Sequence, residues 1–175
     1  MKRDGGPTAA FLLAQIGAHA AQRFGERMGA LGLSAPHAGI LRVLAESPGL
    51  SQQALGARLS IVPSRLVALL DDLEKKGVVE RRDHPEDRRV YAVHLTTEGR
   101  KRLEAVGRAA REHDRAVCAG LSDEERGLLA SLLERIAGEQ GLTPGVHPGY
   151  RTLGAACPPD PAREAPPRRG RDRDR

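Results

Sequence analysis

Residues 50–99 read LSQQALGARLSIVPSRLVALLDDLEKKGVVERRDHPEDRRVYAVHLTTEG, and this stretch carries the most distinctive pattern of the chain. From Pro63 to Lys76 the leucines recur at the i, i+3, i+4, i+7 spacing of an amphipathic helix. After Gly77 two short runs rich in β-branched residues flank a segment of turn-forming residues, which is typical of a β-hairpin. The stretch therefore predicts a helix over residues 63–76 followed by a hairpin over residues 78–95.

The predicted hairpin is strongly basic. A charge run is usually only a solvated face, but guanidinium groups on a protruding loop also suit the narrow, electronegative minor groove of DNA. The basic residues are Arg81, Arg82, Arg88 and Arg89. Asp87 lies among them and would be misplaced near phosphates, so we expect it to orient a neighbouring arginine through a charge-assisted hydrogen bond.

The helix before the hairpin has the form of a DNA-reading helix. A major groove about 12 Å wide admits one α-helix, which must bury one side and present the other. The leucines would face inward, and the first residues of such a helix usually touch base edges, so Ser64 and Arg65 are the candidates for base contacts. The residues predicted to face DNA are Pro63, Ser64, Arg65, Val67, Ala68 and Lys75.

Three further helices are predicted upstream of the reading helix. Apolar residues recur every three to four positions over residues 8–31. Ser34 is an N-cap for a second helix that stops at Pro48, and Ser51 is an N-cap for a short third one.

Two more helices are predicted downstream of the hairpin. Thr96 is an N-cap for a helix that runs to about residue 119. Ser122 and Glu125 form a capping box for a final helix, which ends near Gly141.

The predicted fold is mostly α with a small β-hairpin wing. A winged helix-turn-helix lobe occupies residues 34–95, and the helices at 8–31 and 97–138 flank it as a dimerisation region, within a domain of residues 8–140. Residues 141–175 are rich in Pro, Gly and Arg with few large apolar side chains, so this tail is predicted to be largely disordered.

The chain resembles the MarR (multiple antibiotic resistance regulator) family over about residues 8–137. Asp87 and Arg89 match the DxR element of the family's wing. Leu95, Thr96 and Gly99 match the Leu-Thr and Gly that follow that element. The resemblance implies a homodimer that binds a palindromic operator in double-stranded DNA, usually as a repressor, and often releases it on binding a small anionic or phenolic ligand.

Two residues depart from the family pattern. Val62 stands where a capping Asp or Ser is common, and Ala68 where many relatives carry a longer polar residue. Fewer side chains then reach the bases, so readout of DNA shape through the wing is expected to carry more of the specificity.

The helices at both ends of the chain are more apolar than the small lobe requires. Such surplus apolar stripes suggest mutual burial across a two-fold axis. The alternative is a single internal core of three helices within one chain, and the resemblance favours the dimer.

Composition limits the remaining function classes. The chain has 175 residues and a net charge of +5, and a basic domain attracts polyanions. Aromatic residues make up 2%, too few for base-stacking platforms, which favours duplex over single-stranded nucleic acid. No apolar run could span a membrane, no signal peptide is apparent, and the expected location is cytoplasmic. No catalytic or cofactor-binding motif is present, so neither an enzyme nor a cofactor is expected.

Four residues are candidates for contact with an effector. His19, Arg23, His37 and His113 could approach the junction between the lobe and the flanking helices, although a lone histidine is more often structural. No metal-ligand spacing completes a zinc site, and Cys118 and Cys157 form no CxxC pair. The leading hypothesis is a ligand-released repressor; the alternatives are a constitutive architectural DNA-binding protein and a zinc-responsive regulator.

Overall fold

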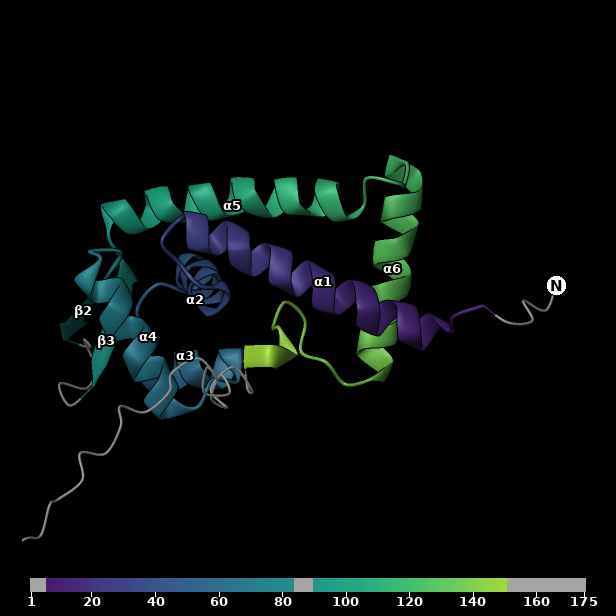
Figure 1. Ribbon diagram of the computed structural model, residues 1–175. Coiled ribbons are helices and arrows are strands. Elements are labelled where there is room, and N and C mark those ends of the chain that lie inside the picture. Colours follow the sequence, from purple (N-terminus) through teal and green to yellow (C-terminus); the bar gives the residue numbers. More distant parts are fainter. Residues whose placement is uncertain (1–5, 84–89, 151–175) are drawn as a thin grey trace, which may run out of the picture.

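The computed structural model describes residues 6–83 and 90–150. Its helices are α1 (Ala9–Ala30), α2 (Ala35–Glu46), α3 (Gln52–Leu59), α4 (Pro63–Lys75), α5 (Thr97–Val117) and α6 (Asp123–Glu139). Its strands are β1 (Leu50–Ser51), β2 (Val79–Asp83) and β3 (Tyr91–Leu95), and a short 3-10 turn, η1, covers Pro148–Tyr150 (Figure 1). The predicted mostly helical fold with a small β wing is confirmed.

The capping residues set where the helices begin. The hydroxyls of Thr8, Ser51 and Thr96 each accept a hydrogen bond from a backbone N–H in the first turn of α1, α3 and α5. Ser122 and Glu125 form the predicted capping box of α6. Each cap satisfies backbone donors that have no partner within the helix, so the helix starts agree with the sequence.

The wing is a three-stranded antiparallel sheet in the order β1-β3-β2. Val79 pairs with Leu95 and Asp83 with Tyr91, which gives the predicted hairpin. Strand β1, which has two residues and pairs Leu50 with Val93, was not predicted from the sequence. A strand this short has no detectable periodicity.

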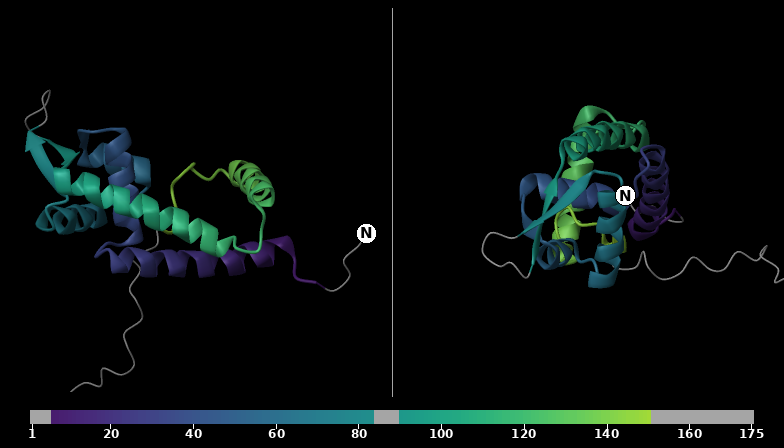
Figure 2. Two further views of the ribbon diagram at one scale, coloured as in Figure 1. Left: turned by 90° about the horizontal axis from the view of Figure 1, so that it is seen from above. Right: turned by 90° about the vertical axis from the view of Figure 1, so that its left-hand side faces the viewer.

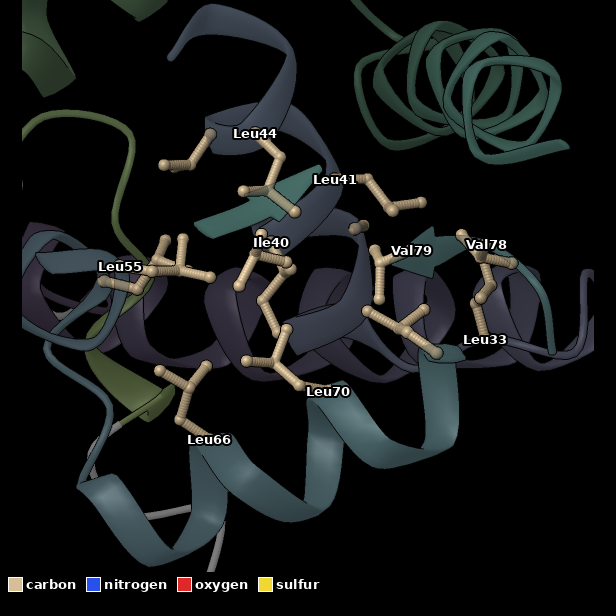
Figure 3. Packing of buried hydrophobic residues seen from close by; sticks show 14 of the residues in the cluster. Leu33, Ile40, Leu41, Leu44, Leu55, Leu66, Leu70, Val78 and Val79 are labelled. Atoms are coloured by element: carbon tan, nitrogen blue, oxygen red, sulfur yellow. The ribbon is translucent and has the colours of Figure 1, made fainter. Parts of the chain in front are cut away.

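The core lies between α2, α3, α4 and the sheet. Figure 3 shows Ile40 of α2 between Leu55 of α3 and Leu70 of α4, with Leu44 and Leu41 of the same helix above it in the same cluster. These side chains are at most 1% exposed. Burying a leucine of this size stabilises a fold by about 1.5–3 kcal/mol, so the apolar faces of three short helices hold the lobe together.

The terminal helices extend away from this lobe. α1 packs along α5, whereas α6 stands at the opposite end of α5 from the wing and has no buried residue (Figures 1 and 2). Large apolar side chains of α1 and α6 are 37–62% exposed. They are Phe11, Leu12, Leu13, Ile16, Leu128, Leu129, Leu132, Leu133 and Ile136. The single internal core of three helices is therefore not formed within one chain.

The first residues after α6 pack against the lobe, while the prediction of a largely disordered tail over residues 141–175 stays a prediction. The described chain returns from α6 toward the lobe, where Tyr150 is 7% exposed and its hydroxyl donates to the Ala35 carbonyl at 3.2 Å (Figure 1). A Cβ at position 39 would lie 2.9 Å from the Tyr150 hydroxyl, so Gly39 makes room for the ring. Arg42 donates to the Gly145 carbonyl. We call residues 141–150 the C-terminal strap; residues 151–175 lie outside the described part.

Among the described residues, no single helix is long and apolar enough to cross a membrane. Helices α1 and α2 meet that criterion only as a pair, and their axes are bent by 76°.

Candidate nucleic-acid interface

The outer face of α4 carries the predicted DNA-facing residues. Pro63, Ser64, Val67, Ala68 and Lys75 are all exposed. The inner face buries Leu66, Leu70 and Leu73. As the sequence suggested, the N-cap residue Val62 supplies no side-chain hydrogen bond, and Pro63 follows it at the start of the helix. The first backbone N–H groups of α4 are thus left without a side-chain cap.

Arg81 joins the wing to α4. Its Nη2 lies 2.6 Å from Oδ1 of Asp71, and its Nη1 contacts Glu74. Burial by itself would lower the pKa of Arg81, but the hydrogen bond to Asp71 and the charge of Glu74 raise it overall, so the guanidinium stays charged. Two carboxylates of α4 hold this side chain, which therefore fixes β2 against α4. A phosphate contact by Arg81 stays a prediction.

The pairing of Arg81 also changes the charge of the surface. The second half of α4 carries three carboxylates, which would repel DNA if they were free. Arg81 is shared between Asp71 and Glu74, and Lys76 pairs with Asp72. Lys76 is the main cause of the lowered pKa of Asp72. Each acidic residue of α4 thus has a basic partner within the chain, and the two cations reduce the charge of the three carboxylates from −3 to −1.

Arg82 is the exposed arginine of β2. Its side chain is 61% exposed and contacts Glu80 on the same strand. A surface ion pair of this kind contributes only about 0–1 kcal/mol, so Arg82 can exchange Glu80 for a phosphate at little cost. Successive side chains of a strand point to opposite faces, so Arg82 lies on the other face of β2 from Arg81 and is an exposed cation of the wing.

The base of the wing is anchored by the Leu-Thr and Gly motif. The Thr96 hydroxyl accepts from the Gly99 N–H at 3.0 Å and donates to the Gly77 carbonyl at 2.7 Å. A Cβ at position 99 would lie 2.1 Å from the Val78 carbonyl oxygen. Gly99 is therefore required for α5 to start this close to β2, which gives the sequence motif a structural meaning.

The tip of the wing falls outside the described residues. Asp87, Arg88 and Arg89 all lie there, so their predicted roles toward DNA stay predictions.

Arg65 is placed differently from the other α4 residues. Its side chain is half-buried, and its Nη1 is buried without a hydrogen-bond partner in the described part of the chain. Arg65 lines a cavity of about 480 Å³ between α1, the start of α2 and the strap. The predicted base contact by Arg65 stays a prediction, but the side chain rests on the inner side of the lobe.

The structure does not bring the four predicted effector residues together. His19 is exposed, and Arg23 pairs with Glu26 at 3.1 Å. The His113 ring packs beside Phe24, with ring centres 5.4 Å apart. None of the four lines the cavity at Arg65.

His37 has a structural role at the start of α2. Its Nδ1 accepts a hydrogen bond from the Ser34 N–H at 3.2 Å, and its Nε2 lies 3.5 Å from Oδ2 of Asp72. Burial lowers the pKa of His37 and outweighs the opposing effect of Asp72. The neutral ring is the form that can accept at Nδ1. Within residues 6–83 and 90–150, no group of three potential metal ligands occurs.

Comparison with known proteins agrees with this geometry. A sequence profile described as MarR family matches residues 31–90. The chain is 33% identical to the HTH-type transcriptional repressor Rv2887 of Mycobacterium tuberculosis over 132 residues, which are 74% of this chain and 93% of that protein. It is 40% identical to a putative transcriptional regulatory protein for the hcr operon of Thauera aromatica. That match covers 61% of this chain and spans only 64% of the Thauera protein.

Solved structures show the same fold. The structure of Rv2887 in complex with DNA has a TM-score of 0.66 and 27% identity, and the match covers 75% of this chain and 98% of that one. A probable transcriptional regulator from Pseudomonas aeruginosa has a TM-score of 0.64 and 32% identity, with 74% and 96% covered. The structure of Rv2887 with salicylic acid has a TM-score of 0.61 and 28% identity, with 75% and 98% covered.

Proposed function

Because the chain belongs to the MarR family of winged helix-turn-helix transcriptional regulators, we propose that it is a repressor that binds a palindromic operator as a homodimer. The observation that carries this proposal is the face made by α4 and the wing. Each acidic residue of α4 is paired with a basic side chain of the same chain, and Lys75 of α4 and Arg82 of the wing remain exposed. Such a face fits the major groove and its flanking phosphates.

The homodimer is supported by the exposed apolar side chains of α1 and α6. Monomeric proteins rarely expose a contiguous apolar patch of this kind. A second copy brings the same apolar residues, because a two-fold interface uses the same surface on both chains. Two recognition helices about 34 Å apart would then enter successive major grooves on one face of the DNA.

Release by a small ligand is the finer part of the proposal. The relative Rv2887 has been crystallised both with DNA and with salicylic acid. The cavity beside Arg65 has a volume within the 300–1,000 Å³ usual for small-molecule sites. We therefore place the effector between the lobe and α1.

Footprinting on the promoter of the chain's own gene tests the proposal. We expect protection of a palindrome and, in light scattering, a dimer. Arg82→Ala should reduce the slope of log affinity against log salt by about 0.9 for each lost phosphate contact. Arg115→Ala, at the end of α5 away from the wing, is the matched control and should leave that slope unchanged. Equal affinity for unrelated duplexes would favour the constitutive architectural alternative.

A further inference from the structure

The first two turns of α4 present a mainly apolar surface on the outer face of the helix. Side chains at positions i, i+3, i+4 and i+7 share one face of a helix, and here they are Ser64, Val67, Ala68 and Asp71. Ser64, Val67 and Ala68 are exposed, and so is Pro63, which lies one turn before Val67. We call Pro63, Val67 and Ala68 the apolar patch of α4. The Ser64 hydroxyl is the polar group beside it.

The longer polar side chains of this part of α4 are engaged elsewhere. Arg65 rests on the inner side of the lobe, where its Nη1 is buried. The Asp71 carboxylate accepts from Nη2 of Arg81 at 2.6 Å, and Glu74 contacts the same guanidinium. Neither an arginine nor an unpaired carboxylate is therefore free on the outer face of α4, which the structure describes in full.

This arrangement limits which bases the start of α4 can read through hydrogen bonds. Guanine is commonly read by a bidentate arginine or lysine, and the cytosine amino group by a carboxylate. Lys75 is exposed, but it lies about three helical turns after Ser64. Base edges are usually touched by the first residues of a recognition helix. The apolar patch therefore occupies the place where base contacts are expected.

An exposed valine is an unfavourable residue for a helix surface without a partner. β-Branched side chains lose rotamer freedom in a helix, which lowers their helix propensity. Val67 is nevertheless 38% exposed on the face of α4 that points away from the core. Single exposed apolar residues are normal, but this one adjoins Pro63 and Ala68 on the proposed DNA-binding surface. The patch is best explained by a partner that brings an apolar group to it.

Thymine brings such a group into the major groove. Its C5-methyl group is the apolar feature among base edges that otherwise present hydrogen-bond donors and acceptors. Apolar side chains of a recognition helix can pack on this methyl group, and a serine hydroxyl can bond to any of the bases. Two apolar side chains with a hydroxyl beside them are thus complementary to a thymine and its neighbouring base.

We propose that α4 recognises thymine in the operator by apolar contact, with Val67 packed on a C5-methyl group, Ala68 beside it and Ser64 bonded to an adjoining base edge. The inference rests on the proposed operator binding and adds the chemical group that is read. It makes Val67 the specificity-determining residue of the helix. The cations of the wing then supply affinity for phosphates, which carry no sequence information directly.

Replacement of thymine by deoxyuridine tests the proposal, because it removes the C5-methyl group and keeps the base pair. The probe is the promoter fragment of the chain's own gene, with one thymine of a footprinted half-site replaced at a time. The full chain should lose affinity about fourfold where the contacted methyl group is removed, which corresponds to about 0.8 kcal/mol for one buried group of this size. Equal affinity for the unmodified duplex and every substituted duplex would overturn the proposal.

A double-mutant cycle assigns the contact to Val67. Deoxyuridine also alters base stacking, so the quantity measured is the coupling between the base and the side chain. Val67→Ala shortens the side chain, and the substitution that costs the wild type fourfold should cost this variant almost nothing. Val90→Ala is the matched control, because Val90 is also 38% exposed but lies in the wing, just before β3. It should keep the fourfold loss.

Two results of the cycle would contradict the contact. One is an undiminished fourfold loss in Val67→Ala, and the other is a loss that disappears equally in Val90→Ala. Thermal unfolding should show that Val67→Ala is folded, because Val67 lies outside the buried core and alanine has the higher helix propensity.

Footprinting of the wild type on unmodified DNA tests the repressor proposal separately. A protein that protects its operator but does not distinguish thymine from deoxyuridine fails in this inference alone. A protein that protects no site fails in the proposed function itself.

Discussion

Gly99 is the position where the structure makes the sharpest prediction about stability. A Cβ at this residue would lie 2.1 Å from the Val78 carbonyl oxygen and 3.2 Å from its carbon. Ordinary contacts begin at 3.4 Å, so the oxygen would have to retreat by about 1.3 Å. The same oxygen accepts the Thr96 N–H at 3.2 Å, which the movement would break.

The magnitude follows from two opposing effects. Overpacking against a backbone atom costs about 1–3 kcal/mol, and this contact belongs at the upper end of that range. Alanine returns about 1 kcal/mol through its higher helix propensity. Gly99→Ala should therefore destabilise the protein by about 2 kcal/mol, which lowers Tm by about 6 °C for a domain of this size.

Gly107 in the same helix is the matched control. Among the described residues, a Cβ there meets Nη1 of Arg111 alone, at an ordinary 3.5 Å. Gly107→Ala should gain the helix propensity alone, about 1 kcal/mol, and raise Tm by about 3 °C. Thermal unfolding followed by circular dichroism compares the two variants. If the Tm of Gly99→Ala equals or exceeds that of Gly107→Ala, the close approach of the Val78 carbonyl to position 99 does not constrain the start of α5, and the prediction is refuted.

Two further predictions concern the lobe. Arg81→Ala should lower the free energy of unfolding in urea by about 1–3 kcal/mol, because Asp71 and Glu74 lose their partner. It should also weaken binding to every DNA sequence alike, because the two freed carboxylates lie next to the phosphates. A loss of affinity confined to one operator sequence would contradict this. The lowered pKa of His37, caused mainly by burial, means that its contribution to stability is complete above pH 6.5 and is lost as pH falls below that value. Urea unfolding at pH 7.5 and 5.5 should show a smaller pH effect in His37→Gln than in wild type, and an equal effect would refute the assignment.

The elements that depend on local sequence patterns could be predicted from the sequence. The leucine spacing of α4 and the caps at Ser51, Thr96 and Ser122 are local signals, because the residues that interact are close in sequence. The pairing of Arg81 with Asp71 could not be predicted in this way. Its partners lie on another element, and which of several nearby arginines they meet depends on how β2 packs on α4.

The packing of the C-terminal strap against the lobe also could not be predicted from local sequence signals. The average composition of residues 141–175 predicts disorder. It gives little weight to a single aromatic residue, Tyr150, that packs against the lobe. Tyr150 docks because Gly39, more than 100 residues earlier, leaves room for its ring. The inward position of Arg65 was likewise invisible, since a helical pattern places a side chain on a face but does not choose its rotamer.

The separation between the lobe and the terminal helices has a genetic consequence. The exposed apolar residues of α1 and α6 lie far along α5 from α4, so damage to one region leaves the other intact. In the proposed dimer, a chain with a defective α4 still pairs with a normal chain and withdraws it from the operator. Mutations in the lobe should thus be dominant over the wild-type allele. Mutations that remove the apolar residues of α6 should be recessive, because such a chain pairs with nothing.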